Sequence, residues 1–181
     1  METLLRKAME SHPDTQLIIF PELAVTGYQC GKILKTWQKL PRSTLTSVKK
    51  MSALAKEFHV HIVYGMAEKE EDILYNSQFF IDDTGVLLGT YRKVHLFDSE
   101  KNYFTPGDQF KVFNTKIGRI GLFICYDAFF PEAARSLAIQ GVDLLVNSTN
   151  WEKPYDYDIA KQMKHDYYTM LTERRPDVYI A

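Results

Sequence analysis

Residues 119–147 read RIGLFICYDAFFPEAARSLAIQGVDLLVN, and in this stretch an apolar run, a helical pattern and a second apolar run follow one another. The first run, 119–125, is typical of a buried strand. Pro131 suits the first turn of a helix, and Gly141 suits its end. The second run, 143–147, is again typical of a buried strand. The stretch therefore indicates a mixed α/β fold.

Two helices and a β-meander are predicted on the amino-terminal side of this stretch. Helical spacing of apolar residues places the helices at 2–10 and 43–58. A short apolar run between them predicts a buried strand at 17–20. The meander has three strands: 61–66, 74–81 and 86–93.

Two turns of the predicted sheets can be placed from polar residues and glycine. A charged turn, 68–72, is expected between the first two strands of the meander. A five-residue loop, 114–118, is expected to join strands 110–113 and 119–125 as a hairpin. No repeat or low-complexity linker interrupts the pattern, so residues 1–181 are predicted to form a single domain.

The composition is that of an ordinary soluble domain. The 181 residues are 45% hydrophobic, and 22 Lys and Arg oppose 23 Asp and Glu for a formal net charge of −1. This balance favours neither a nucleic acid nor an anionic membrane as partner. We find no signal-peptide core and no run near the ~20 apolar residues of a membrane span. Two cysteines, Cys30 and Cys125, make no disulfide framework, so we expect a cytoplasmic protein with reduced thiols.

Glu22, Lys93 and Cys125 each stand at or shortly after the end of a predicted strand. Side chains just beyond the carboxyl ends of strands in an α/β sheet converge on one crevice. A cysteine supplies a nucleophile, a carboxylate can take its proton, and an ammonium both favours the thiolate and stabilises an oxyanion. Each residue alone is more often structural, but the three types together favour nucleophilic catalysis.

Other kinds of site have less support. Five histidines leave a Cys–His dyad open. His95 is the nearest of them to Lys93, but a role in orienting the loop explains it better. No spacing is typical of a metal site, and no glycine-rich phosphate-binding pattern is present, so neither a metal nor a nucleotide cofactor is expected.

Three ordered blocks resemble the signature blocks of the nitrilase superfamily of carbon–nitrogen hydrolases. They are FPELAVTGY at 20–28, YRKVHLF at 91–97, and ICYD at 124–127 with FPE at 130–132. Connecting motifs extend the resemblance from about residue 1 to Trp151. It implies a four-layer α-β-β-α sandwich, in which two β-sheets face each other between layers of helices.

The resemblance also implies site residues. The family's Glu–Lys–Cys triad falls on Glu22, Lys93 and Cys125, and a further glutamate that assists the site falls on Glu100. In the mechanism that follows, the backbone N–H of Tyr126 faces the oxyanion. Two aromatic residues, Phe129 and Trp151, are candidate walls of the substrate pocket, with core packing as the alternative for both.

The implied activity is hydrolysis of a non-peptide carbon–nitrogen bond in a small linear amide or N-carbamoyl compound. The reaction passes through a thioester and releases ammonia or an amine, without metal or organic cofactor. A nitrile hydrolase using the same triad is an alternative, and a non-catalytic nitrilase-like protein is another. Family members commonly pair as homodimers or larger homo-oligomers through the helix after the nucleophile, here 131–140.

Two segments of the family pattern are missing from the sequence. The family normally opens with a strand before its first helix, whereas this chain begins on the helix. After Trp151 a large segment is also missing, yet 174–179 resembles the family's extreme carboxyl terminus. We therefore expect a junction between residues 156 and 161 at which distant parts of the family sequence adjoin, and an incomplete hydrolase domain.

Overall fold

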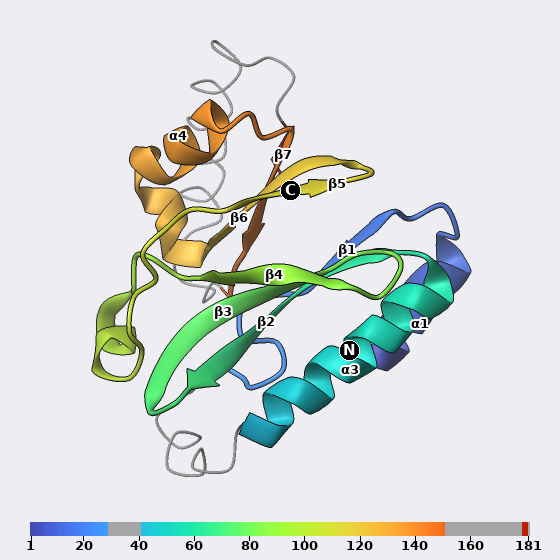
Figure 1. Cartoon of the computed structure of the whole chain (residues 1–181), viewed down its shortest axis with the longest axis horizontal. Helices are drawn as coiled ribbons and strands as arrows, with labels where there is room; N and C mark the ends of the chain where they lie inside the picture. The colour runs from blue at the N-terminus through green and yellow to red at the C-terminus, as the bar shows by residue number, and fades with distance from the viewer. Residues whose placement is uncertain (29–40, 151–178, 181) are drawn as a thin grey trace.

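The computed structural model describes residues 1–28, 41–150 and 179–180 of the chain, the last two and residues 41–43 by their backbone alone. Figure 1 shows two sheets that face each other, with helices on their outer sides. The described helices are α1 (Glu2–Ser11), α3 (Pro41–Phe58) and α4 (Pro131–Ile139). None of them has both the length and the apolar composition that a membrane span requires.

The first sheet has the strand order β1-β2-β3-β4. A short parallel strand, β1, pairs with β2, and β2, β3 and β4 then follow as an antiparallel meander. This confirms the predicted meander. The strands are β1 (Leu17–Ile19), β2 (His61–Glu70), β3 (Ile73–Ile81) and β4 (Leu87–Arg92).

The second sheet has the order β5-β6-β7-β8. An antiparallel hairpin of β5 and β6 forms one edge, and β6, β7 and β8 run parallel, with α4 between β6 and β7 in the chain. The strands are β5 (Val112–Thr115), β6 (Gly118–Ile124), β7 (Leu144–Ser148) and β8 (Tyr179–Ile180).

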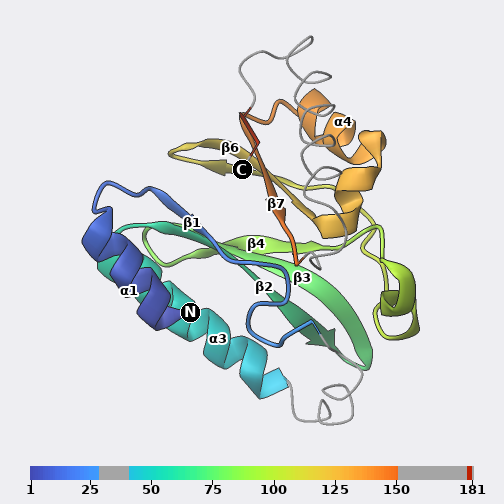
Figure 2. The ribbon, with the colours of Figure 1, turned by 180° about the vertical axis from the view of Figure 1, so that it is seen from behind.

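Two apolar cores hold these layers together. Buried residues of α1 and α3, such as Leu5 and Leu54, pack with Ile62 on the outer face of the first sheet. A separate core between the sheets joins residues such as Phe80 and Leu122. Figure 2 shows α1 and α3 side by side on the first sheet and α4 on the opposite side of the second. The predicted four-layer sandwich is therefore confirmed.

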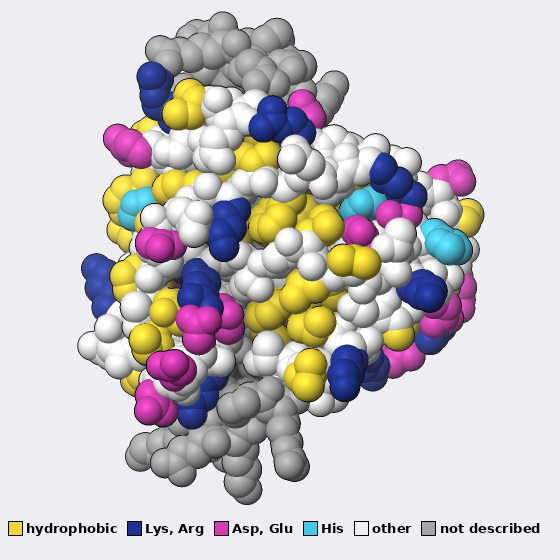
Figure 3. All heavy atoms as spheres, viewed as in Figure 1, with side chains coloured by type: hydrophobic (Ala, Val, Ile, Leu, Met, Phe, Trp, Pro, Cys, Tyr) yellow, Lys and Arg dark blue, Asp and Glu magenta, His cyan; other side chains and the backbone are white. Residues whose placement is uncertain are grey.

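The surface carries charges of both signs. On the face in Figure 3, basic and acidic side chains lie interspersed among apolar and neutral ones. On the helical side, Arg6 of α1 pairs with Glu57 of α3, with 2.5 Å between Nη1 and Oε1. These mixed charges agree with the near-zero net charge of the sequence.

Two predicted turns are wrong in length. The charged segment 68–72 was expected to be a turn, but β2 continues to Glu70 because its last residues pair with the first residues of β3. The expected five-residue loop 114–118 is shorter, since Asn114 and Thr115 belong to β5 and Gly118 to β6. In both hairpins, cross-strand hydrogen bonds continue through polar residues that sequence patterns assign to turns.

The expected junction between residues 156 and 161 and the resemblance at 174–179 fall wholly or largely outside the described residues, and the junction stays a prediction.

Candidate active site

A loop after β1 carries Glu22 into the space between the sheets. The side chain is buried, and the next residue, Leu23, has a φ of 51°, which turns the chain sharply. The loop crosses Gly65 of β2 at very close range, since a Cβ atom on Gly65 would lie 2.5 Å from the Leu23 nitrogen and 2.9 Å from the Glu22 Cα. A glycine at this point of β2 therefore permits the position of Glu22.

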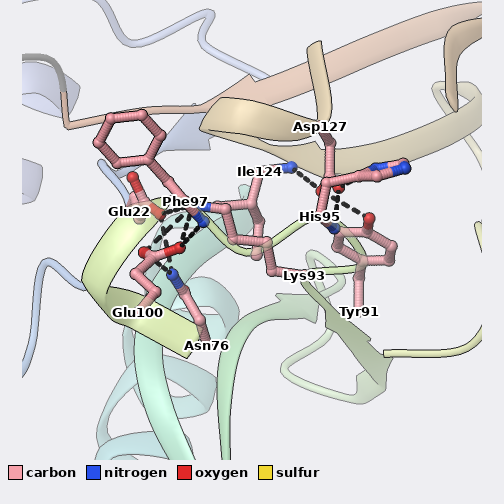
Figure 4. A network of polar contacts seen from close by, with 9 residues as sticks. All are labelled: Glu22, Asn76, Tyr91, Lys93, His95, Phe97, Glu100, Ile124 and Asp127. Carbon is pink, nitrogen blue, oxygen red and sulfur yellow. Dashed lines mark hydrogen bonds and ion pairs between the residues drawn. The ribbon is translucent and has the colours of Figure 1, made fainter. Parts of the chain in front are cut away.

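Four buried polar side chains meet at the end of the first sheet (Figure 4). The Lys93 Nζ, directly after β4, lies 2.7 Å from Glu22 Oε1 and 2.9 Å from Glu100 Oε2. The amide of Asn76, on β3, donates to Glu22 Oε1 at 2.8 Å and to Glu100 Oε1 at 3.1 Å. One ammonium and one amide thus hold two carboxylates that would otherwise repel each other.

The 3₁₀ turn Asp98–Asn102 positions Glu100. The Glu100 Oε2 accepts a hydrogen bond from the Phe97 backbone N–H at 2.7 Å, and the Glu100 side chain is buried. Glu100 is therefore not a solvated loop carboxylate, although its neighbour Lys101 is exposed. The turn folds the side chain inward, away from its exposed sequence neighbour.

Burial shifts the proton affinities of this cluster. Burial raises the pKa of the Glu22 carboxyl, and the nearby Glu100 adds to the rise, although Lys93 and Asn76 act in the opposite direction. Burial alone would lower the pKa of the Lys93 ammonium, but the negative charges of Glu22 and Glu100 outweigh it and raise that pKa. Lys93 therefore keeps its positive charge, and the raised pKa makes the Glu22 carboxylate a better proton acceptor than an ordinary glutamate.

Cys125 lies at a strained turn between β6 and the 3₁₀ turn Cys125–Phe129. Its φ is 44°, a conformation that residues with a Cβ rarely adopt and that often marks functional positions. The side chain is buried and makes no disulfide. Electrostatic interactions with both Glu22 and Lys93 place the thiol next to the charged cluster.

The resting thiol is protonated, contrary to the expectation that Lys93 favours a thiolate. Burial and the charge of Glu22 raise the pKa of the Cys125 thiol to about 11, and the opposite effects of Lys93, Thr149 and the Asn150 backbone are smaller. At the sulfur, the Glu22 carboxylate and the Lys93 ammonium act in opposite directions, and burial has the largest effect. Removal of the proton therefore needs a nearby base, and the Glu22 carboxylate is a candidate for that role.

Asp127 fixes the turn that carries Cys125. Its Oδ2 accepts hydrogen bonds from the Ile124 N–H at 2.9 Å and the Tyr91 hydroxyl at 2.7 Å. Its Oδ1 accepts from the His95 N–H at 2.8 Å and contacts the His95 ring at 3.0 Å. Asp127 thus holds the loop through hydrogen bonds to three groups. His95 orients that loop as expected, and no described contact joins a histidine to the sulfur.

Aromatic rings border the nucleophile turn. The ring of Tyr126 lies 5.1 Å from the rings of both Phe97 and Phe129. Phe129 is 45% exposed, so burial in the core does not account for it, and its role as a wall of the substrate pocket stays a prediction. The other candidate wall, Trp151, lies outside the described residues.

The structure thus brings Glu22, Lys93 and Glu100 into direct contact and places Cys125 beside them. Sequence reasoning missed Asn76, which lies inside a motif that carried the resemblance but was given no role. An asparagine in an apolar strand is the signal that could have found it, because a buried amide needs polar partners. Within 1–28 and 41–150, no three His, Cys, Asp or Glu side chains form a group suited to a metal ion.

The model of the carbon–nitrogen hydrolase family matches residues 1–170. The chain belongs to the carbon–nitrogen hydrolase family. The matched range includes Glu22, Lys93 and Cys125, so the buried cluster lies within the part of the chain that matches the family.

Relatives within the family carry names of related activities. The chain is 46% identical over 169 residues to the "Probable nitrilase C965.09" of Schizosaccharomyces pombe, covering 91% of this chain and 62% of the relative. It is 39% identical over 152 residues to an N-carbamoylputrescine amidase of Arabidopsis thaliana, covering 80% and 51%. The chain therefore spans between half and two thirds of the length of these family members.

A solved family structure shows the same fold. A mutant amidase from Nesterenkonia sp. AN1 matches with a TM-score of 0.73 and 25% identity, over 82% of this chain and 58% of that one. In that amidase, acrylamide has undergone Michael addition at the active-site cysteine.

Proposed function

We propose that this member of the carbon–nitrogen hydrolase family cleaves the carbon–nitrogen bond of a small linear amide or N-carbamoyl compound, with Cys125 as nucleophile. The observation that carries the proposal is the buried cluster of Glu22, Lys93 and Glu100 beside Cys125 at its strained turn. Amide substrates are favoured over nitriles because amidases are among both the relatives and the solved structures that match.

Glu22 acts as the general base. Lys93 and Asn76 both donate to its Oε1, while its Oε2 is buried and has no hydrogen-bond partner within the described part of the chain. An unpaired buried carboxylate oxygen is costly unless another group uses it. We assign Oε2 the task of accepting the Cys125 proton, which the high pKa of the thiol makes necessary.

Acylation follows from this assignment. The Cys125 sulfur attacks the carbonyl carbon as its proton passes to Glu22, and the carbonyl oxygen becomes an oxyanion. The Lys93 ammonium and the Tyr126 N–H stabilise that charge, and one such donor is typically worth about 100–1000-fold in rate. Glu22 then gives the proton to the leaving nitrogen, the carbon–nitrogen bond breaks, and a thioester remains.

Deacylation uses the same groups. Glu22 removes a proton from water, the resulting hydroxide attacks the thioester carbon, and the sulfur leaves and is reprotonated. Glu100 does not need to transfer a proton in either acylation or deacylation. Its contact with Lys93 keeps the ammonium charged and in place throughout both steps.

The test is turnover by the purified full-length protein. We expect ammonia release from at least one compound in a panel of short ω-amides, carbamoyl amines and aliphatic nitriles. Cys125→Ala should abolish turnover without unfolding the protein, while Cys30→Ala, its matched control, should leave it near wild type. Equal loss from both changes, or no turnover of any compound, would contradict the proposal and favour a non-catalytic role.

We further propose that the protein forms homodimers or larger homo-oligomers through α4. Ile139, near the end of α4, is 76% exposed on the outer side of the second sheet. Burial of such apolar surface against a second copy would stabilise the pair. Ile139→Glu should shift the protein to the monomer position in size-exclusion chromatography, and an unchanged profile would contradict this interface.

A further inference from the structure

Gln78, in the middle of β3, is a fully buried residue that the proposed chemistry does not use. It has no exposed surface, and neither its Nε2 nor its Oε1 has a hydrogen-bond partner among the described residues. A buried amide with four unused hydrogen-bonding positions is strongly unfavourable, so native proteins almost always satisfy such a group. The position of Gln78 in the sheet indicates which group forms hydrogen bonds with its amide.

The side chain of Gln78 lies on the face of the first sheet that carries the active site. Side chains alternate between the two faces of a strand. Phe80, two residues along, packs in the core between the sheets, whereas Phe79 packs in the core under the helices. Gln78 therefore shares the inner face with Phe80 and with Asn76.

Gln78 has active-site supports on both sides. On β2 it pairs with Gly65, over which the Glu22 loop crosses. On β4 it pairs with Tyr91, whose hydroxyl donates to Asp127. Gln78 thus lies between Gly65, which contacts the Glu22 loop, and Tyr91, which contacts Asp127 in the turn that carries Cys125.

Asn76 has a matching unpaired atom. Its Nδ2 donates to both Glu22 and Glu100 (Figure 4), but its Oδ1 is buried without a partner in the described residues. This orientation is required, because Oδ1 in place of Nδ2 would face two carboxylates. No side chain in the described part of the chain donates a hydrogen bond to the Asn76 Oδ1.

We propose that Gln78 is a positioning residue that, through an internal water molecule, donates to Asn76 Oδ1 and so keeps the Asn76 amide directed at Glu22. The side chains start about 7 Å apart, two residues along a strand, a separation that a glutamine and one water can bridge. A polar, buried site with several unpaired atoms is where internal water is held. This inference rests on the proposed role of Glu22 as base.

The hydrogen bond from Asn76 stabilises the charged form of Glu22 and lowers the pKa of that carboxyl. Loss of the Gln78 amide should weaken this bond and raise the pKa of Glu22. We expect Gln78→Met, which keeps the length of the side chain, to raise that pKa by up to about one unit, the effect of one hydrogen bond to a charged group. Carbon-13 NMR titration of glutamate-labelled protein measures this shift directly.

Activity gives a second measurement on the same variant. The acidic limb of the pH profile of kcat/KM should move to higher pH by the same amount, with kcat lowered up to about tenfold and KM little changed. Because the NMR titration needs no turnover, a wild-type protein without hydrolase activity would contradict the proposed function and still leave the role of Gln78 testable.

Ser77→Ala is the matched control. Ser77 is also buried on β3, but it faces the other side of the sheet and donates to Glu68. The control should leave the pKa of Glu22 at its wild-type value. If Gln78→Met does not fold, Gln78→Asn retains an amide and should give a smaller shift in the same direction. A wild-type pKa for Glu22 in the Gln78 variant that folds would overturn the proposal.

Discussion

At the level of single residues, the Lys93 ammonium balances the buried charges of the site. It is fully buried and contacts the carboxylates of Glu22 and Glu100 at 2.7 and 2.9 Å. Without it, two acidic groups would share one buried space, and one of them would bind a proton. Lys93 therefore stabilises the cluster, and its charge is the one that the proposed oxyanion would need.

Lys93→Met should lower kcat much more than it raises KM. The charge of Lys93 is needed chiefly when the oxyanion forms, so the loss appears in the transition state, by about 100–1000-fold. Steady-state kinetics on the best substrate of the panel measure the two constants. Lys101→Met, at an exposed lysine of the adjoining turn, is the control and should leave both unchanged. An unchanged kcat in Lys93→Met would give Lys93 a structural role only.

At the level of elements, short loops at the ends of strands carry the chemistry, and strands hold the loops in place. Three groups illustrate this: Glu22 follows β1, Lys93 follows β4 and Cys125 follows β6. The two central strands of the first sheet, β2 and β3, supply the close contact at Gly65 and the amide of Asn76. The geometry of the site therefore depends on backbone contacts as much as on side chains.

Gly65→Ala should impair activity strongly. The added methyl group would lie 2.5 Å from the Leu23 nitrogen and 2.7 Å from the Pro21 oxygen, so the Glu22 loop must move. We expect destabilisation of about 1–3 kcal/mol, typical of overpacking, and at least a tenfold loss of kcat, as displacement of a catalytic group produces. Thermal unfolding and kinetics measure the two effects.

Gly121→Ala is the control for this change. The nearest atoms to its added methyl group would be side-chain atoms of Val142 and Leu137, at 3.0 Å and beyond, which can adjust. Its effect on kcat should be small. Comparable losses of kcat in both variants would argue against a specific role of the Gly65 contact.

A second group of contacts joins the strands of the meander. The Arg92 guanidinium, on β4, makes two hydrogen bonds of 2.8 Å to Glu68 on β2, and Ser77 on β3 donates to the same carboxylate at 2.7 Å. Burial alone would raise the pKa of Glu68, but these hydrogen bonds outweigh it and lower the pKa below its ordinary value of 4.5. The ionised carboxylate therefore stabilises the folded state.

The contribution of Glu68 should depend on pH. Because the pKa is lower in the folded state, the stabilisation is complete above about pH 4.5 and is lost as the pH falls through the folded-state pKa. Glu68→Gln should cost about 1–3 kcal/mol at pH 7, as hydrogen bonds to charged groups do. Denaturant unfolding at pH 7, 5 and 3 should show that difference shrink at the lowest pH. A constant difference would contradict the linkage.

At the level of the whole molecule, polar contacts join the two sheets around the apolar core. Ser148, at the end of β7, donates to the Phe20 carbonyl at 2.9 Å, directly before the Glu22 loop. The Tyr91 hydroxyl joins the first sheet to Asp127 beside Cys125. The relative position of the sheets therefore sets the relative position of Glu22 and Cys125.

Ser148→Ala should weaken this connection. It leaves the Phe20 carbonyl without its side-chain donor, at an expected cost of about 1–2 kcal/mol in the free energy of unfolding. Because Phe20 adjoins the Glu22 loop, kcat should fall as well, by about threefold or more. Thr115→Val removes a hydroxyl that bonds only within the distant β5–β6 hairpin and serves as the control for kcat. A stable Ser148→Ala variant with wild-type kcat would show that this contact between the sheets does not affect the active site.

The amino-acid sequence by itself determined the class of fold, the meander, and the three blocks that carry Glu22, Lys93 and Cys125. These features depend on local patterns: periods of apolar residues, helix-starting proline, and short motifs at strand ends. The two turns predicted with the wrong length, at 68–72 and 114–118, depend instead on hydrogen bonds from a neighbouring strand. Such bonds cannot be predicted from the composition of one strand alone.

Only the tertiary structure decided which groups meet and in what state of charge. Asn76 comes from a strand that the sequence separates from Glu22 by more than fifty residues, yet its amide donates to both Glu22 and Glu100. Burial also raises the pKa of the Cys125 thiol to about 11. Proton affinity depends on distance and solvent exclusion in three dimensions, and neither can be read from the order of residues.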